Sequence, residues 1–205
     1  MVNDRLGGVE AAKLVLYSVN FAEVKRLTLA DDWDGLAALM QDAARKLEDA
    51  GCDCLMIGAN TMHKIADEVQ TAVQVPLINI ATVTAATVAE QNIRKVALLG
   101  TRYTMQLDFY AKKLAERSIE TIIPGQADID YINNAIYEEF GKGIFLPATK
   151  QRFLEIIRAL SGGGAEGVIF GCTEIPMLIS PRESPIPGFD TTRIHAKAAV
   201  DFALS

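Results

Sequence analysis

Short apolar runs alternate along the chain with segments whose apolar residues recur every three or four positions. The short runs predict buried strands, and the periodic segments predict amphipathic helices. The predicted strands are residues 12–19, 52–59, 75–80, 94–101, 120–124 and 167–172. The predicted helices are residues 31–51, 62–73, 82–92, 105–118, 128–143, 148–160, 174–179 and 191–204, with 184–190 leading into the last. This alternation is typical of an α/β fold with a mostly parallel sheet.

Two stretches resemble each other, "LMIGANT" at residues 55–61 and "GVIFGCT" at residues 167–173. In each, an apolar strand ends in a glycine, a small residue and polar residues. Either all α/β units look alike in this way, or the chain contains a duplication, which we favour. A duplication predicts two pseudo-symmetric α/β domains with parallel sheets. Because the strand at 94–101 has no counterpart in the first half, we expect the first domain to lack its opening strand and most of a helix.

The net charge of −6 and the absence of a basic patch argue against a nucleic-acid partner. No apolar run approaches the ~20 residues that span a bilayer. The chain has three cysteines, an odd number, and two of them, Cys52 and Cys54, alternate within one predicted strand. This pattern suggests packing in a reducing cytoplasm and not disulfide bridging. The histidines and cysteines show no metal-ligand spacing, and no glycine-rich nucleotide motif is present. We therefore expect neither a metal nor a cofactor.

The two similar turns lie where parallel α/β proteins bind ligands, at the carboxyl ends of strands. Backbone N–H groups and the helix dipole can hold a carboxylate there. Short side chains that add donors are Asn60, Thr61, Thr101 and Thr173. The same field predicts a lowered pKa and a reactive thiol for Cys172, although a cysteine at a strand end can also be buried filler.

Four other residues have both a functional and a structural interpretation. His63 can serve the site or only begin a helix, and His195 is expected to be structural. Glu174 can be an ordinary acid at a helix start, but we favour a role in orienting the chemistry. Lys142, between glycines in "GKGIF", can be solvated or can reach an anionic substrate.

Five segments of the chain are characteristic: "GANTMHK", "VALLGTRYTM", "IYEEFGKGIF", "GCTEI" and "FDTTRIHAKAAV". Together they resemble the aspartate/glutamate racemase family, in its enterobacterial-type branch. The resemblance implies domains at 1–86 plus 190–205 and at 87–189, with the active site in a cleft between them, commonly in a homodimer. It also implies cofactor-free racemisation of an acidic amino acid, in which one residue removes the α-proton and another returns a proton from the opposite face.

Carried over by position, Cys172 matches the second catalytic cysteine, and Ala59 stands where the family has its first. The resemblance implies carboxylate-binding roles for Asn60, Thr61, Thr101 and Thr173, a contact with the side-chain carboxylate for Lys142 and, in a divergent stretch, a substrate-binding role for Arg26. We also expect Glu174 among the substrate-binding residues.

Alanine cannot relay a proton, so one face of the substrate lacks its thiol unless water or His63 serves it. We therefore expect activity that is absent, biased towards one enantiomer, or limited to α-proton exchange. Two alternatives stay open: a one-cysteine decarboxylase of malonate-like acids, and a degenerate protein that binds an acidic amino acid or only dimerises.

Overall fold

The computed structural model describes residues 1–205, which fold into two compact units. Unit 1 comprises Met1–Ile57, Met62–Asn79 and Ala196–Ser205, and unit 2 comprises Gly58–Thr61 and Ile80–His195. The turn Gly58–Thr61 therefore belongs to unit 2, although the chain on either side of it lies in unit 1. The domain boundaries expected from the sequence stay a prediction.

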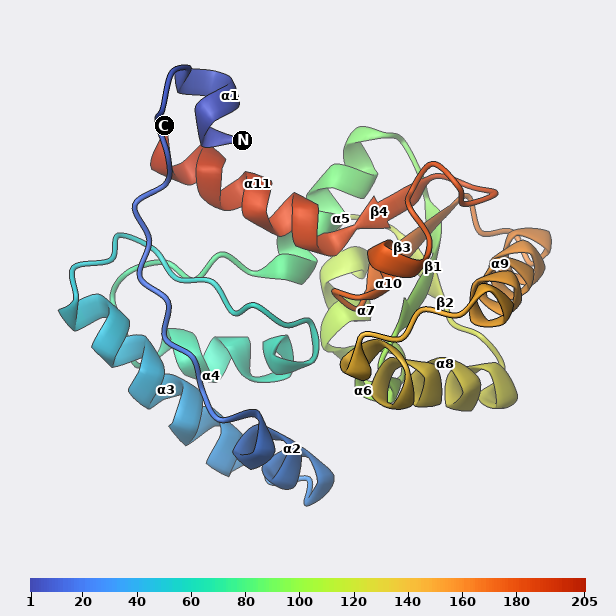
Figure 1. The fold of residues 1–205 in the computed structure, drawn as a ribbon, viewed down its shortest axis with the longest axis horizontal. Helices are drawn as coiled ribbons and strands as arrows, with labels where there is room; N and C mark the ends of the chain where they lie inside the picture. The colour runs from blue at the N-terminus through green and yellow to red at the C-terminus, as the bar shows by residue number, and fades with distance from the viewer. The chain divides into compact units, whose positions relative to one another are not determined.

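Unit 2 is built on a four-stranded parallel sheet with the order β2-β1-β3-β4 (Figure 1). The strands are β1 (Lys95–Gly100), β2 (Glu120–Ile122), β3 (Gly167–Gly171) and β4 (Gly188–Asp190). The first three confirm predicted strands, whereas β4 lies in a segment that was predicted only to lead into the last helix. Its Gly188 and Phe189 pair with Val168 and Ile169 of β3, a long-range contact that local pattern does not reveal.

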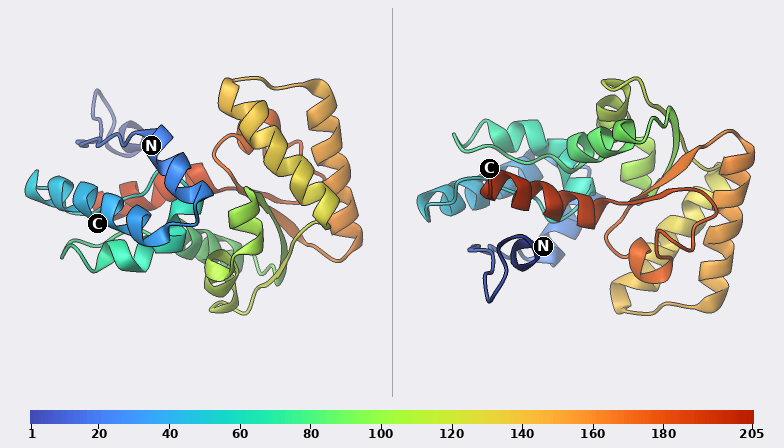
Figure 2. Two further views of the ribbon diagram at one scale, coloured as in Figure 1. Left: turned by 90° about the horizontal axis from the view of Figure 1, so that it is seen from below. Right: turned by 90° about the horizontal axis from the view of Figure 1, so that it is seen from above.

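Helices pack on both faces of this sheet, as the continuous apolar runs of β1 and β3 predict. Successive β1 residues enter different cores, because side chains alternate across a strand. Ala97 and Leu99 pack in the core shared with α8 and α9, and Val96 and Leu98 pack in the core shared with α5 and α7. Figure 2 shows α8 and α9 together on one side of the sheet. The α/β class expected from the sequence is thus confirmed for unit 2.

The helices of unit 2 follow the predicted segments closely. They are α5 (Ile80–Glu90), α6 (Arg102–Gln106), α7 (Asp108–Ala115), α8 (Gln126–Glu138), α9 (Pro147–Gly162), α10 (Ile175–Leu178) and the start of α11 (Thr191–Ala203), with the short 3₁₀ helix η2 (Phe140–Lys142). The predicted helix at 105–118 is divided in two, since Leu107 adopts an extended conformation between α6 and α7.

Unit 1 is helical. It contains α1 (Val2–Leu6), α2 (Phe21–Leu29), α3 (Trp33–Asp49), α4 (Ala66–Gln70), most of the 3₁₀ helix η1 (Thr61–Ile65) and the end of α11. The predicted helix at 31–51 is confirmed as α3. The Asp32 carboxylate accepts the N–H of Gly35 at 2.9 Å, and Gly51 ends the segment with a φ of +83°.

The predicted strands of unit 1 are wrong. Residues 11–19 are irregular and mostly exposed, with Leu14 76% and Leu16 81% exposed. Residues 52–59 and 75–80 share only one parallel bridge, between Leu55 and Leu77. The expected second parallel sheet is therefore absent, although the segments have strand-like composition.

Around residue 75, side chains make the hydrogen bonds to backbone groups that a neighbouring strand would otherwise make. Glu48 of α3 accepts the backbone N–H groups of Gln74 at 2.7 Å and Val75 at 3.0 Å. Gln70 accepts the N–H of Leu77 at 2.7 Å and donates to the carbonyl of Val75 at 3.1 Å. Because these backbone groups are already satisfied, the segment has little to gain locally from pairing with a neighbouring strand.

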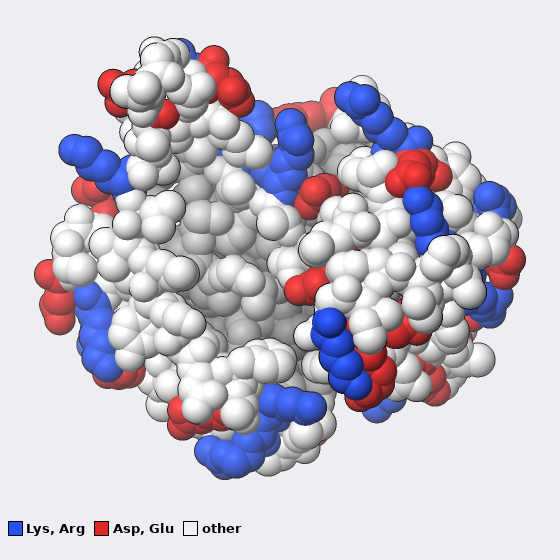
Figure 3. Space-filling model, viewed as in Figure 1, with Lys and Arg blue, Asp and Glu red and all other residues white.

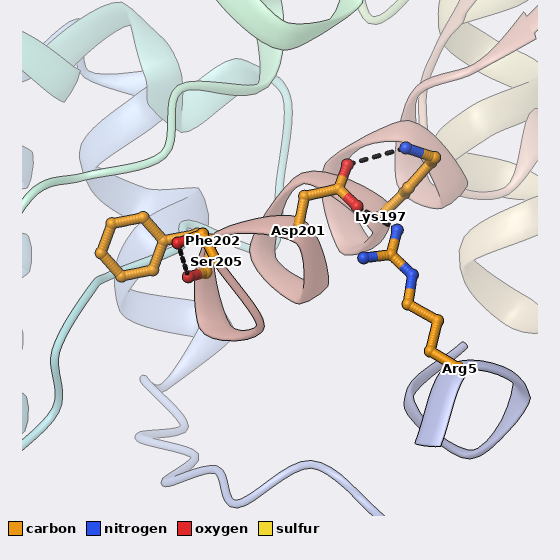
Figure 4. Close-up of polar contacts among 5 residues, drawn as sticks. All are labelled: Arg5, Lys197, Asp201, Phe202 and Ser205. Atoms are coloured by element: carbon orange, nitrogen blue, oxygen red, sulfur yellow. Dashed lines mark hydrogen bonds and ion pairs between the residues drawn. The ribbon is translucent and has the colours of Figure 1, made fainter. Parts of the chain in front are cut away.

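Ion pairs join the two ends of the chain within unit 1. Asp201 accepts Lys197 at 2.7 Å and also pairs with Arg5 of α1, and the Ser205 hydroxyl donates to the Phe202 carbonyl at 2.8 Å (Figure 4). Elsewhere, basic and acidic side chains are interspersed in the view of Figure 3, without a broad patch of one sign. No helix is both long and apolar enough to cross a bilayer.

Candidate active site

The carboxyl ends of β1 and β3 approach each other closely. Gly100 and Gly171 are paired in register, and a Cβ added to Gly171 would lie 2.8 Å from the carbonyl oxygen of Leu99. Neither strand end has room for a side chain at this point. The next residues on the two strands, Thr101 and Cys172, therefore begin side by side at the edge of the sheet.

A cluster of three hydroxyl groups ties the Gly58–Thr61 turn to the end of β1. Within this hydroxyl cluster, Thr61 Oγ1 lies 2.9 Å from Thr101 Oγ1 and 3.4 Å from Thr104 Oγ1, and the last two lie 3.2 Å apart. Thr101 also caps α6 by accepting the backbone N–H of Thr104 at 3.2 Å. The pairing is non-local, because Thr61 and Thr101 are 40 residues apart in sequence.

A second connection ties the same turn to β3 and α11. Asn60 Nδ2 donates to Thr191 Oγ1 at 3.1 Å, and that hydroxyl donates to the carbonyl of Phe170 at 2.8 Å. Phe170 belongs to β3 and lies two residues before Cys172. The turn that carries Ala59, Asn60 and Thr61 is therefore anchored at the edge where β1 and β3 end.

The Cys172 thiol is buried and donates to the Glu174 carboxylate, with Sγ and Oε2 2.9 Å apart. Burial raises the pKa of Cys172, and the charge of Glu174 raises it further. The backbone N–H groups of Glu174 and Thr173 favour the thiolate, as expected, but they are outweighed. The predicted lowering of the Cys172 pKa is therefore wrong. The helix that follows, α10, is a single turn, whereas burial and the carboxylate act directly on the sulfur.

We expect Glu174→Gln to lower the pKa of Cys172, because it removes the negative charge that disfavours the thiolate. Since the thiolate is the nucleophile, alkylation of Cys172 by iodoacetamide should extend to lower pH. The rate is measured against pH in a background that lacks Cys52 and Cys54. Glu116→Gln, at the exposed residue that caps the C-terminus of α7, is the matched control and should leave the profile unchanged. An unchanged or upward-shifted profile in Glu174→Gln would contradict the assigned cause.

The remaining predicted residues have other surroundings. Thr173 and Ala59 are half-buried in unit 2. Lys142 is exposed and pairs with Glu138 of α8 at 2.6 Å. Lys142 takes no part in the hydrogen bonds that join the Gly58–Thr61 turn to β1 and β3.

Arg26 and both histidines lie on helical elements. Arg26 is exposed on α2 of unit 1, and His63 is buried in η1 of unit 1. His195 is buried on α11 in unit 2, one turn after Thr191. No group of three or more His, Cys, Asp or Glu side chains is placed to hold a metal ion.

Sequence reasoning missed two residues that connect the site, Thr104 and Thr191. Both are fully buried threonines: Thr191 begins α11 directly after β4, and Thr104 lies in the first turn of α6, which follows β1. A buried hydroxyl needs a partner, so threonine at such a corner is a usable signal. The partner of Thr191 lies 131 residues away, however, and no local pattern indicates it.

Known proteins share both the sequence and the fold. The Asp/Glu/hydantoin racemase family matches residues 6–199. The broad specificity amino-acid racemase RacX of Bacillus subtilis is 27% identical over 176 residues, which cover 85% of this chain and 75% of RacX.

Two solved structures match at higher identity. A provisionally assigned Asp/Glu racemase from Yersinia pestis is 42% identical with a TM-score of 0.92, covering 100% of this chain and 89% of that one. An aspartate racemase homologue from Pyrococcus horikoshii is 32% identical with a TM-score of 0.86, covering 99% of this chain and 88% of that one. The chain therefore belongs to the Asp/Glu/hydantoin racemase family.

Proposed function

We propose that this protein exchanges the α-proton of an acidic amino acid, aspartate or glutamate, without a cofactor, and that Cys172 is its catalytic thiol. The observation that carries the proposal is the pair formed by Cys172 and Glu174, with Sγ and Oε2 2.9 Å apart beside the anchored turn of residues 58–61. Family membership supports amino-acid racemisation as the reaction class. As the resemblance implies, the active protein is a homodimer.

In this mechanism the Cys172 thiol begins protonated, since burial and Glu174 raise its pKa. When Cys172 acts as the acid, its S–H bond breaks as the Cα–H bond of the product forms, and a thiolate remains. When it acts as the base, the thiol proton first moves to the Glu174 carboxylate, and the thiolate then removes the α-proton. When substrate binds, the Thr61 and Thr101 hydroxyl groups leave their mutual hydrogen bond and donate to the substrate carboxylate, which stabilises charge that develops beside it.

In the proposed site, Ala59 occupies the position that faces the opposite side of the substrate, and its methyl side chain can neither give nor take a proton. Proton transfer by a placed side chain contributes typically about 10²–10⁴-fold to a rate. The two enantiomers should therefore differ, because only one presents its α-proton to the thiol of Cys172.

The test follows each enantiomer of aspartate and of glutamate separately in deuterated water. Loss of the α-proton is read by NMR and inversion by chiral chromatography. We expect one enantiomer of the substrate to exchange at least ~100-fold faster than the other. Ala59→Cys should raise exchange of the slower enantiomer, and Ala148→Cys, on the exposed face of α9, is the matched control. Equal, fast inversion of both enantiomers by the unaltered protein, or no exchange of either, would contradict the proposal.

One observation favours a second candidate, a decarboxylase of malonate-like acids. That reaction needs a single proton donor, and Cys172 is a buried thiol with a raised pKa whose counterpart in sequence is Ala59. Release of carbon dioxide from phenylmalonate, without exchange of any amino-acid α-proton, would favour the decarboxylase over the racemase.

A further inference from the structure

The Thr191 hydroxyl determines which way the Asn60 amide points. A hydroxyl group has one hydrogen, and in Thr191 it is directed to the carbonyl oxygen of Phe170, 2.8 Å away. The same oxygen can therefore only accept from Asn60, 3.1 Å away. The atom of Asn60 that faces Thr191 must be the NH₂ nitrogen, because a carbonyl oxygen there would meet another acceptor.

The opposite atom of the amide, Asn60 Oδ1, is consequently a fixed acceptor. It is buried and has no hydrogen-bond partner, in a residue that is only 4% exposed. A buried acceptor without a donor is destabilising, so its persistence at a site calls for an explanation. The neighbouring hydroxyl cluster does not supply one, since its members bond to each other.

The chemistry of this acceptor selects one group of an amino acid. Carboxylates only accept hydrogen bonds, so Asn60 Oδ1 cannot bind one. An ammonium group carries three donors and a positive charge, and its hydrogen bonds to buried acceptors are the stronger kind. The role implied for Asn60 by the family resemblance, binding of the carboxylate, therefore fits Thr61 and Thr101 better than Asn60.

We infer that Thr191 is a positioning residue that holds Asn60 Oδ1 ready for the α-ammonium group of the substrate, so that the turn selects amino acids over their des-amino analogues. This inference deepens the proposed function and rests on it for the ligand class. Thr191 does not itself touch the substrate.

The test compares binding of aspartate with binding of succinate, which has the same two carboxylates and no ammonium group. Calorimetry measures both affinities for the unaltered protein, for Thr191→Val and for Thr191→Ser. A charged hydrogen bond is worth about 1.5–3 kcal/mol, so aspartate should bind roughly 10- to 100-fold more tightly than succinate. Thr191→Val, which releases the amide to turn over, should bring the ratio of affinities close to one. Thr191→Ser keeps the hydroxyl and should keep the ratio.

Circular dichroism would reveal whether Thr191→Val misfolds. In that case a second variant, Asn60→Ala, still tests the inference. Asn60→Ala should weaken aspartate binding and leave succinate binding nearly unchanged. The inference is overturned by equal affinities in the unaltered protein, by a Thr191→Val ratio equal to that of the unaltered protein, or by failure of both ligands to bind.

The readout is independent of turnover. Loss of selectivity in Thr191→Val, together with no α-proton exchange by the unaltered protein, would reject the proposed racemisation and keep the inference. If the unaltered protein exchanges the α-proton but Thr191→Val keeps the same aspartate-to-succinate affinity ratio, the inference is rejected and the proposed racemisation is kept.

Discussion

Replacing Cys172 with alanine is expected to lower α-proton exchange by at least ~100-fold for the favoured enantiomer of the substrate. In the proposed mechanism the thiol gives or takes the proton, and alanine leaves Glu174 without the hydrogen-bond donor that lies 2.9 Å from it. The rate is measured by NMR in deuterated water at saturating substrate, so that a change in binding does not enter.

Cys52→Ala is the matched control, because Cys52 is also a free cysteine but lies in unit 1. It should leave exchange unchanged. Cys172→Ser tests the chemistry further, since a hydroxyl is a much weaker acid than a thiol and should not restore the rate. Exchange in Cys172→Ala within a few-fold of the unaltered protein would remove Cys172 from the mechanism.

Replacing Phe153 with alanine is expected to lower the free energy of unfolding of unit 2 by about 3–5 kcal/mol. Phe153 is 0% exposed on α9, and its ring centroid lies 5.6 Å from that of Phe140 and 6.3 Å from that of Tyr131. Alanine would leave a cavity in the core between α8, α9 and the sheet, and would remove both ring contacts.

Amide hydrogen exchange of β1 and β3 measures this loss within unit 2 itself. Phe21→Ala is the matched control, because the Phe21 side chain is 66% exposed on α2 and its loss should change stability by less than ~0.5 kcal/mol. A loss below about 1 kcal/mol in Phe153→Ala would mean that the packing around this ring is not the main support of the sheet.

Three of the four strands of unit 2 could be predicted because their determinants are local. β1 and β3 are continuous apolar runs that are buried on both faces, and that pattern alone specifies a central parallel strand. The same reasoning failed for the strand predicted at residues 12–19 in unit 1, which has a similar composition. A strand exists only when neighbours pair with its backbone, and pairing depends on segments that are distant in sequence.

The position of Cys172 at the end of β3 could also be predicted, whereas the pKa of its thiol could not. A glycine followed by Cys172 at the end of an apolar strand places the thiol at the carboxyl edge of the sheet. Its pKa depends on how deeply the sulfur is buried and on the carboxylate of Glu174, and the first of these is a property of the packed structure.

The sequence by itself thus determined the α/β class, three of the four strands that form the sheet and the two turns that carry Asn60 and Cys172, because each depends on the order of neighbouring residues. Only the tertiary structure decided that Thr191 anchors Asn60 and that the pKa of Cys172 is raised. Both depend on burial and on hydrogen-bond geometry set when distant segments pack together, and neither quantity is encoded in any short stretch of the chain.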